Sequence, residues 1–156
     1  MEFDGAGLAI AIAVFTPSLL LLIFPPRPAL PRPTSPTIFA VLERIGQGGC
    51  LVAPTFFSGT APRGPVGALV VALFALAVYY ALWVRYLARG RLGTLLFAPL
   101  GPCPVPMAVL PVVVFGGVAV WMLSPWVGVA TAVLAAGHVT VSKSIRTQQN
   151  RAKSER

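Results

Sequence analysis

The chain has few charged residues, and acidic residues are the scarcest of them. Only 10% of its 156 residues are charged, and four Asp or Glu stand against twelve Lys or Arg, which gives a net charge of +8. Hydrophobic residues make up 56% of the chain. A water-soluble chain of this length needs more polar surface to cover itself, so the composition excludes an ordinary soluble domain.

Residue types that bind metals or carry out catalysis are also scarce. The two cysteines, Cys50 and Cys103, and the single histidine, His138, cannot supply a four-ligand metal site unless carboxylates join them. The sequence contains no Ser, His and Asp set, no glycine-rich phosphate loop and no pair of catalytic carboxylates. We therefore expect no metal, no cofactor and no enzymatic activity.

Five apolar stretches fill most of the chain, and each is close to the roughly 17 to 25 residues that a helix needs to cross a bilayer. They cover residues 5–24, 38–57, 67–84, 107–123 and 126–142. The predicted fold class is an all-α integral membrane protein, a five-span transmembrane helix bundle. Residues 1–142 form one transmembrane domain in this prediction, and residues 143–156 form a basic tail.

Basic residues fall into alternate gaps between the apolar stretches. Two arginines lie in the first gap, three in the third and five basic residues in the tail, whereas the second gap has only Arg63 and the fourth has none. Because positively charged loops stay in the cytoplasm, this asymmetry predicts an N-terminus outside and a cytoplasmic C-terminus. The same topology accounts for the net charge, so we expect a lipid bilayer and no nucleic acid as the partner.

Two kinds of residue are expected at the membrane interfaces. The basic tail lacks an apolar stripe, so we expect a helix end that frays into a solvated segment near anionic headgroups. Trp83, Trp121 and Trp126 lie near the ends of predicted spans, where aromatic rings normally anchor to headgroups.

Proline and glycine interrupt the regular pattern in two places. Pro17 lies inside the first stretch and predicts a kink, with the hydroxyls of Thr16 and Ser18 partly satisfying the freed carbonyl. Residues 92–106 combine a short apolar run with a segment rich in glycine and proline. This segment is an interfacial helix, a re-entrant piece or a bent extension of the fourth span, and its periodicity does not choose among them.

Polar side chains inside the predicted spans are the candidates for function, because such groups are costly in hydrocarbon. By the helical rise of about 1.5 Å per residue, Glu43 lies roughly 8 Å inside the second stretch, and His138 lies about 8 Å from the cytoplasmic end of the fifth. Aromatic residues of the third stretch reach the same depth on one helix face. The predicted polar layer consists of Glu43, Arg44, Gln47, His138, Tyr79 and Trp83.

Small residues at steps of three and four predict where helices approach each other closely. One such set shares the face of Glu43 on the second stretch, and another repeats every four residues on the fifth, so we expect these two faces to pack together. The predicted packing residues are Gly46, Gly49 and Cys50 on the second stretch and Gly128, Ala132 and Ala136 on the fifth.

Glu43 has two candidate partners. In the first hypothesis Glu43 pairs with His138 and the two share a proton, with Gln47 as an added hydrogen-bond partner. In the second, Glu43 pairs with Arg44 of a neighbouring helix or with lipid headgroups, and His138 is an ordinary interfacial residue. The second is the more economical, because positions this close to the interface are wet and charges there cost little.

Three segments of the chain resemble a family of small, uncharacterised bacterial multi-pass membrane proteins. The segments are Leu42–Cys50, Tyr79–Tyr86 and Gly137–Ser142. In that family a glutamate followed by Ile-Gly and Gly-Cys, an aromatic third span and a terminal Gly-His look similar. This chain departs from the family at Ala136, at Ser142 and in its proline-rich gaps. The resemblance implies a bacterial plasma membrane, supplies no activity, and directs attention to Glu43 and His138.

Two functions fit these features. One is a transporter or channel-like subunit for a proton or small solute, in which the polar layer lines a vestibule. Because five spans leave little room for a pathway, this function requires a homo-oligomer. The other is a structural or accessory subunit, without its own activity, that binds a membrane protein partner within a larger complex.

Overall fold

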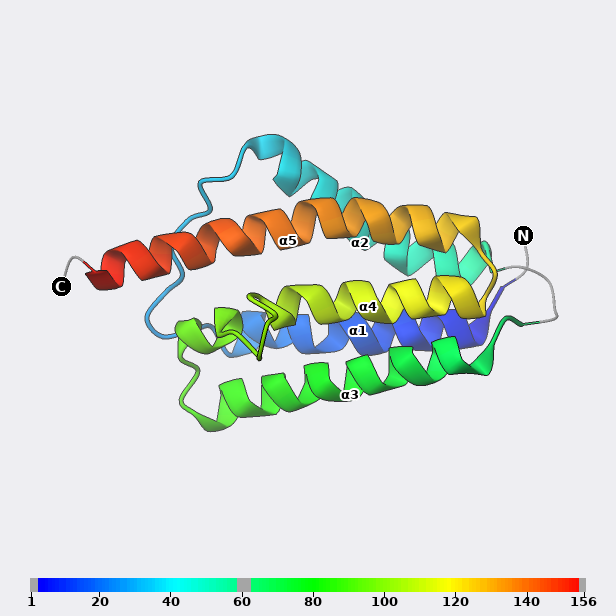
Figure 1. Ribbon diagram of the computed structural model, residues 1–156, viewed down its shortest axis with the longest axis horizontal. Helices are drawn as coiled ribbons and strands as arrows, with labels where there is room; N and C mark the ends of the chain where they lie inside the picture. The colour runs from blue at the N-terminus through cyan, green and yellow to red at the C-terminus, as the bar shows by residue number, and fades with distance from the viewer. Residues whose placement is uncertain (1–2, 59–62, 155–156) are drawn as a thin grey trace.

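The computed structural model describes residues 3–58 and 63–154, and within these ranges the chain is all-α (Figure 1). The helices are α1 (Gly5–Ile23), α2 (Thr37–Phe56), α3 (Val66–Ala88), the short 3-10 helix η1 (Gly93–Phe97), α4 (Pro106–Trp121) and α5 (Pro125–Ser154). The five α-helices coincide with the five apolar stretches. Their bounds differ from the prediction by one or two residues, except that α3 and α5 continue further at their C-terminal ends.

Three helices, α1, α3 and α5, are long and apolar enough to cross a membrane. This finding indicates a multi-pass membrane protein. Of the other two, α4 is apolar but has only 16 residues. α2 has 20 residues but includes Glu43, Arg44 and Gln47, which lower its hydropathy.

The helices form two packed pairs joined through α4. Figure 1 shows α4 between α5 and α3, with α2 along α5 at one edge of the bundle. α2 packs mainly on α5, and α3 packs mainly on α4. α1 contacts α2 and, less extensively, α3 and α4. Within the described residues α2 contacts neither α3 nor η1, so residues of α2 and α3 do not share a site within the chain.

An aromatic cluster fills one end of the bundle. Tyr79, Trp83 and Tyr86 lie on one face of α3, as the spacing predicts, and successive rings meet edge to face at centroid distances of 6.2 and 5.6 Å. They pack against Leu96 of η1 and Met107 of α4. Trp83 is only 4% exposed, so its expected place in an interfacial belt is wrong. The ring instead contributes to the core, where an aromatic side chain buries the most apolar area.

Trp126 and Trp121 lie at the other end of the bundle. Trp126 is 61% exposed, which fits the expected interfacial position. Trp121 is partly buried, and the guanidinium of Arg63 lies 4.8 Å from the centre of its ring. Trp121 therefore anchors a loop as well as a helix end.

Pro17 leaves the carbonyl of Ala13 without its helical N–H partner, because proline has no backbone N–H. The hydroxyl of Tyr80 on α3 donates to this carbonyl at 2.8 Å. Thr16 instead donates to Ile12, and Ser18 pairs with the hydroxyl of Tyr79. The expectation that Thr16 and Ser18 would satisfy the freed carbonyl is therefore wrong, because a side chain from a neighbouring helix reaches it.

Residues 92–106 fold as η1 followed by a tight turn between Leu100 and Cys103, and α4 then begins at Pro106. Leu96 of η1 is buried, and η1 contacts α3, α4 and α5. The segment thus covers one end of the bundle as a short 3-10 turn, and it does not continue α4 into the loop.

The tail is a continuation of α5, which stays helical from Ser142 to Ser154. Its side chains form hydrogen bonds with two neighbouring loops. Arg146 donates to the carbonyl of Pro104 at 2.7 Å, and Gln148 donates to the hydroxyl of Thr34 at 3.0 Å. The expectation of a tail that frays after residue 142 is therefore wrong. The tail has no apolar stripe to pack on the bundle, and hydrogen bonds with two loops connect it to the rest of the protein instead.

Candidate functional site

Glu43 and His138 are in direct contact, as the first of the two sequence hypotheses predicts. The ring atom Nδ1 of His138 on α5 lies 2.6 Å from Oε1 of Glu43 on α2. The side chain of His138 is 25% exposed and that of Glu43 is 20% exposed. A carboxylate and an imidazole at this distance form a charge-assisted hydrogen bond when the ring is protonated, so the pair can hold a proton between them.

Glycine at position 137 allows the two helices to approach at this site. A Cβ atom at Gly137 would lie 2.6 Å from Cα of Glu43 and 2.7 Å from the carbonyl oxygen of Phe39. Both distances are shorter than real Cβ contacts, and backbone atoms cannot move aside as a flexible side chain can. The residue before His138 is therefore restricted to glycine, which places the imidazole within reach of the carboxylate.

The α2–α5 interface is closely packed from the Glu43–His138 pair toward the C-terminal end of α2. A Cβ at Gly46 would overlap the backbone of Leu134, and a Cβ at Gly49 would lie 3.0 Å from Cβ of Ala130. Cys50 is fully buried. The predicted packing role of Gly46, Gly49 and Cys50 is thus present in the structure.

The predicted partner stripe on α5 is wrong. Ala132 and Ala136 are exposed, and nothing lies within 4 Å of a Cβ built at Gly128. The face of α5 that meets α2 contains Ala130, Leu134 and Gly137. Small size permits close approach, but the face that a helix buries is decided by all its neighbours, and α4 also packs on α5.

Polar contacts recur along the α2–α5 interface at intervals of seven residues on both helices. The first is Glu43 with His138, and in the second the buried Cys50 lies beside Thr131, whose hydroxyl donates to the carbonyl of Val127. In the third, the hydroxyl of Ser124, which precedes α5, donates to the carbonyl of Phe57 at 2.6 Å. By the helical rise, successive contacts are about 10.5 Å apart. This spacing is too long for a direct hydrogen bond between them.

The stretches between these polar contacts are apolar and dry. Leu134 lies between the first and second contacts and is 2% exposed, and Val127 lies between the second and third and is fully buried. No chain of polar groups therefore connects the Glu43–His138 pair to the far end of this interface within the described residues.

The predicted polar layer is divided between two places. Gln47 is partly exposed on α2, one turn from Glu43, and Arg44 is exposed. Tyr79 and Trp83 lie on α3, which does not touch α2 within the described residues. The six residues therefore do not form one site within the chain, because α4 separates α3 from the α2–α5 pair, and their common depth stays a prediction.

An ion pair that the sequence pattern did not predict joins the opposite end of the bundle. Asp4 caps the N-terminus of α1 by accepting from the backbone N–H groups of Ala6 and Gly7, and it also pairs with Arg63. Partial burial by itself raises the pKa of Asp4, but hydrogen bonds from Arg63, Gly7 and Ser58 outweigh that effect, and the net pKa lies below its ordinary value. The available signal was an acidic residue before the first span and a single base in the second gap.

Comparisons with known proteins identify no relative. No family model, no curated protein and no solved structure matches the chain. The resemblance to small bacterial membrane proteins therefore stays a prediction. Among the described residues, no group of three or more His, Cys, Asp or Glu could hold a metal ion.

Proposed function

We propose that this protein is a five-span plasma-membrane protein that binds a proton at the Glu43–His138 pair and acts as a transporter or channel-like subunit for a proton or small solute. The observation that carries this proposal is the 2.6 Å contact between Nδ1 of His138 and Oε1 of Glu43. An acid paired with a base at membrane depth is costly to maintain and marks a functional site by default.

Packing supports membrane insertion of the two helices that fall short on hydropathy or length. α2 runs antiparallel along α5, a candidate span, and contacts it from Gly137 to Ala130. α4 packs in the same way along α3, with a Cβ at Gly117 lying 3.0 Å from Cβ of Ala72. A helix that packs closely along a membrane span shares its depth, which favours five spans.

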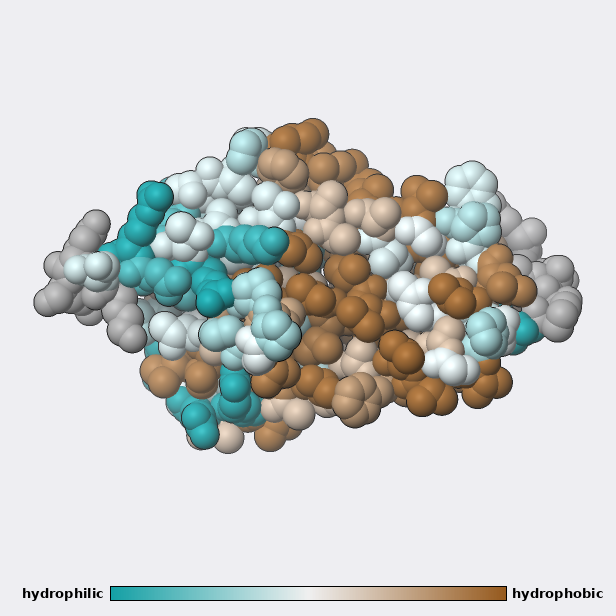
Figure 2. All heavy atoms as spheres, viewed as in Figure 1, coloured by the Kyte–Doolittle hydropathy of each residue, from teal (hydrophilic) through white to brown (hydrophobic). Residues whose placement is uncertain are grey.

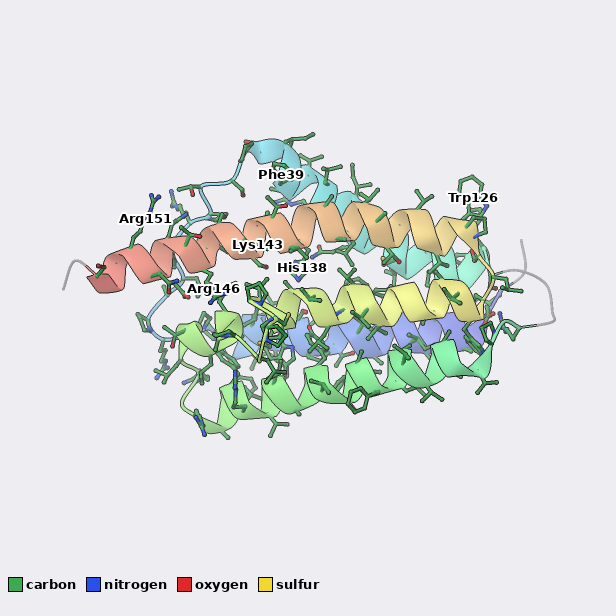
Figure 3. The ribbon with its side chains drawn as sticks, in the orientation of Figure 1. Phe39, Trp126, His138, Lys143, Arg146 and Arg151 are labelled. Carbon is green, nitrogen blue, oxygen red and sulfur yellow. The ribbon has the colours of Figure 1, made fainter. Side chains whose placement is uncertain are left out.

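Charge placement supports an N-terminus outside and a cytoplasmic C-terminus. Figure 2 shows hydrophilic residues gathered at one end of the molecule, over the C-terminal part of α5 and the end of α3, and hydrophobic residues over the middle. In Figure 3, Lys143, Arg146 and Arg151 lie along this end of α5, and Trp126 lies at the other. At that other end Arg63 is paired with Asp4, so the positive charge remains on the side that we assign to the cytoplasm.

The exposure of the pair suits proton exchange with the cytoplasmic side. Both side chains are mostly covered yet retain a fifth to a quarter of their surface, so the pair is not sealed inside the bundle while its orientation stays set by the helices. The event that we assign to the site is the uptake of one proton by the pair, which raises its net charge by one.

A structural or accessory subunit is the second candidate, and the dry packing at Leu134 and Val127 favours it. A single chain with this interface has no polar route along α2 and α5. A complete pathway would therefore need surfaces from a second copy or from a membrane protein partner.

Proton flux into liposomes tests the proposal. Liposomes that contain the protein and a trapped pH-sensitive dye are given a pH gradient across their membrane. We expect liposomes with the wild-type protein to dissipate this gradient faster than protein-free liposomes. Glu43→Gln and His138→Gln should each reduce this rate at least tenfold, whereas the neighbouring Arg44→Gln should retain it. Equal rates for all four proteins would overturn proton transport. A stoichiometric foreign subunit in gently purified native complexes, with no flux, would establish the accessory role instead.

A further inference from the structure

A groove lies on the outer surface of the bundle between α2 and α5. It has a volume of about 460 Å³ and is open along one side. Nine residues line it: Ile45, Gly49, Val52, Ala53 and Phe57 from α2 and its C-terminal end, and Trp126, Val129, Ala130 and Val133 from α5. Apart from backbone groups and the indole N–H, this lining is apolar.

The length of the groove matches one leaflet of a bilayer. Along α2, from Ile45 to Phe57, the helical rise amounts to about 18 Å, and along α5, from Trp126 to Val133, it amounts to about 10.5 Å, so the two walls bracket the length of one leaflet. The hydrocarbon core is about 30 Å thick, so one leaflet contributes about 15 Å. The groove therefore extends from near the middle of the membrane to the end of the bundle that we assign to the outside.

The groove is narrow because its floor is a contact between two helices. At the floor a Cβ built at Gly49 would lie 3.0 Å from Cβ of Ala130, so α2 and α5 already touch there. Val52 and Val129 lie on either side of this floor and are 45% and 59% exposed. A third helix, about 10 to 12 Å across, could fill such a groove only by inserting side chains between Val52 and Val129, whereas a thin hydrocarbon chain fits along its whole length.

Aromatic rings mark the outer end of the groove. The rings of Phe57 and Trp126 lie with their centres 6.1 Å apart. Trp126 is 61% exposed, and Figure 3 shows its side chain pointing away from α5 at the end opposite the basic tail. Tryptophan in such a position lies at the level of the lipid headgroups, where an acyl chain begins its path into the membrane.

We propose that this groove binds one acyl chain of a lipid from the outer leaflet, with the chain's end near Ile45 and Val133. A concave apolar surface contacts more of the chain than a convex helix surface does, so this lipid exchanges more slowly than the lipids around it. The site rests on the membrane insertion of α2 proposed above and does not depend on proton binding.

Lipid retention tests the proposal. The protein is extracted from membranes in mild detergent, and its bound phospholipid is measured by native mass spectrometry and by phosphate analysis. We expect about one phospholipid per chain in the wild type. Val129→Phe should fill the groove and reduce the bound lipid at least fivefold. Val70→Phe on α3 is the matched control, because Val70 is 58% exposed where Val129 is 59% exposed, and it should retain the lipid.

Val52→Phe fills the groove from α2 and should give the same loss, which keeps the test valid if Val129→Phe fails to fold. Equal retention in the wild type and both groove variants would overturn the proposal. A wild-type dimer that Val129→Phe dissociates would also overturn it, because a second copy would then cover this face. Glu43→Gln should keep the lipid. Lipid retained without proton flux would therefore contradict only the proton proposal. Proton flux without retained lipid would contradict only the proposal that the groove binds an acyl chain.

Discussion

The hydroxyl of Tyr80 donates a hydrogen bond at 2.8 Å to the carbonyl of Ala13, which the proline one turn later leaves without its helical partner. Two helices are thereby joined at the place where one of them is interrupted. In a bilayer no water replaces a missing partner, so a proline inside a span depends on its neighbours.

Removal of this hydroxyl should destabilise the protein only while Pro17 is present. Tyr80→Phe should lower the free energy of unfolding by about 0.6 kcal/mol, the average for hydrogen bonds between membrane helices, and by no more than about 1.7 kcal/mol. In a Pro17→Ala background the backbone N–H of residue 17 can satisfy Ala13, so the same change should cost much less. Unfolding in mixed detergent and SDS measures this double-mutant cycle. Equal costs in both backgrounds would show that Tyr80 acts through packing alone.

Gly137→Ala should separate α2 from α5 at the Glu43–His138 contact. The added methyl group would overlap backbone atoms of Glu43 and Phe39, and overpacking of this kind costs about 1 to 3 kcal/mol. Gly128→Ala on the same helix is the matched control. Nothing lies within 4 Å of its Cβ position, so the gain in helix propensity should leave stability unchanged or raise it by up to about 1 kcal/mol. The measurement is SDS-induced unfolding, and equal stability of the two variants would contradict the close approach.

Acid should weaken the end of the bundle that holds Asp4. The pKa of this carboxyl is lower in the folded protein than its ordinary value of 3.8, so the unfolded chain binds a proton more readily. The stabilisation is therefore complete above about pH 5 and is lost as pH falls through the ordinary and then the lowered folded pKa. The loss should appear as a falling melting temperature in detergent below about pH 5. Asp4→Asn keeps a capping side chain but should remove this part of the acid dependence. If Asp4→Asn had the same pH profile as the wild type, Asp4 would not be the source of this acid dependence.

Hydrogen exchange should show protection beyond Ser142. Because α5 continues to Ser154 and Gln148 contacts Thr34, amides in the first two turns after Ser142 should exchange more slowly than an unstructured peptide. Mass spectrometry of peptides from this region measures the rates. Gln148→Ala should speed exchange there, and full exchange at the earliest time point in the wild type would contradict an ordered tail.

Thiol labelling should report the orientation of the chain. Cys103 is partly exposed at the basic end, whereas Cys50 is buried. In a Cys50→Ala variant, a membrane-impermeant maleimide should therefore label Cys103 in inside-out vesicles but not in intact cells. A variant with both cysteines replaced and Val66→Cys should show the opposite pattern, because Val66 is exposed at the other end. Labelling of both positions from one side would contradict the proposed threading.

The amino-acid sequence by itself determined which segments are helical and how charge is distributed between the ends. A helix satisfies every backbone group within its own segment, so the apolar parts of α1 to α5 follow from the hydropathy pattern, whereas the extension of α5 to Ser154 does not. The depth of a residue also follows from its distance to the end of its span. For this reason Glu43 and His138 could be placed at one depth before any contact was known.

Only the tertiary structure decided which helix faces meet and where each polar group finds its partner. Several faces of α5 carry small residues, and the stripe at Ala132 is left exposed because α5 packs on α2 and α4 at once. Trp83 is buried because η1 and α4 cover it, although its position near a span end equally suits an interface. Periodicity ranks the faces of one helix, but the burial of a face depends on the combined packing of all the helices, which no single helix encodes.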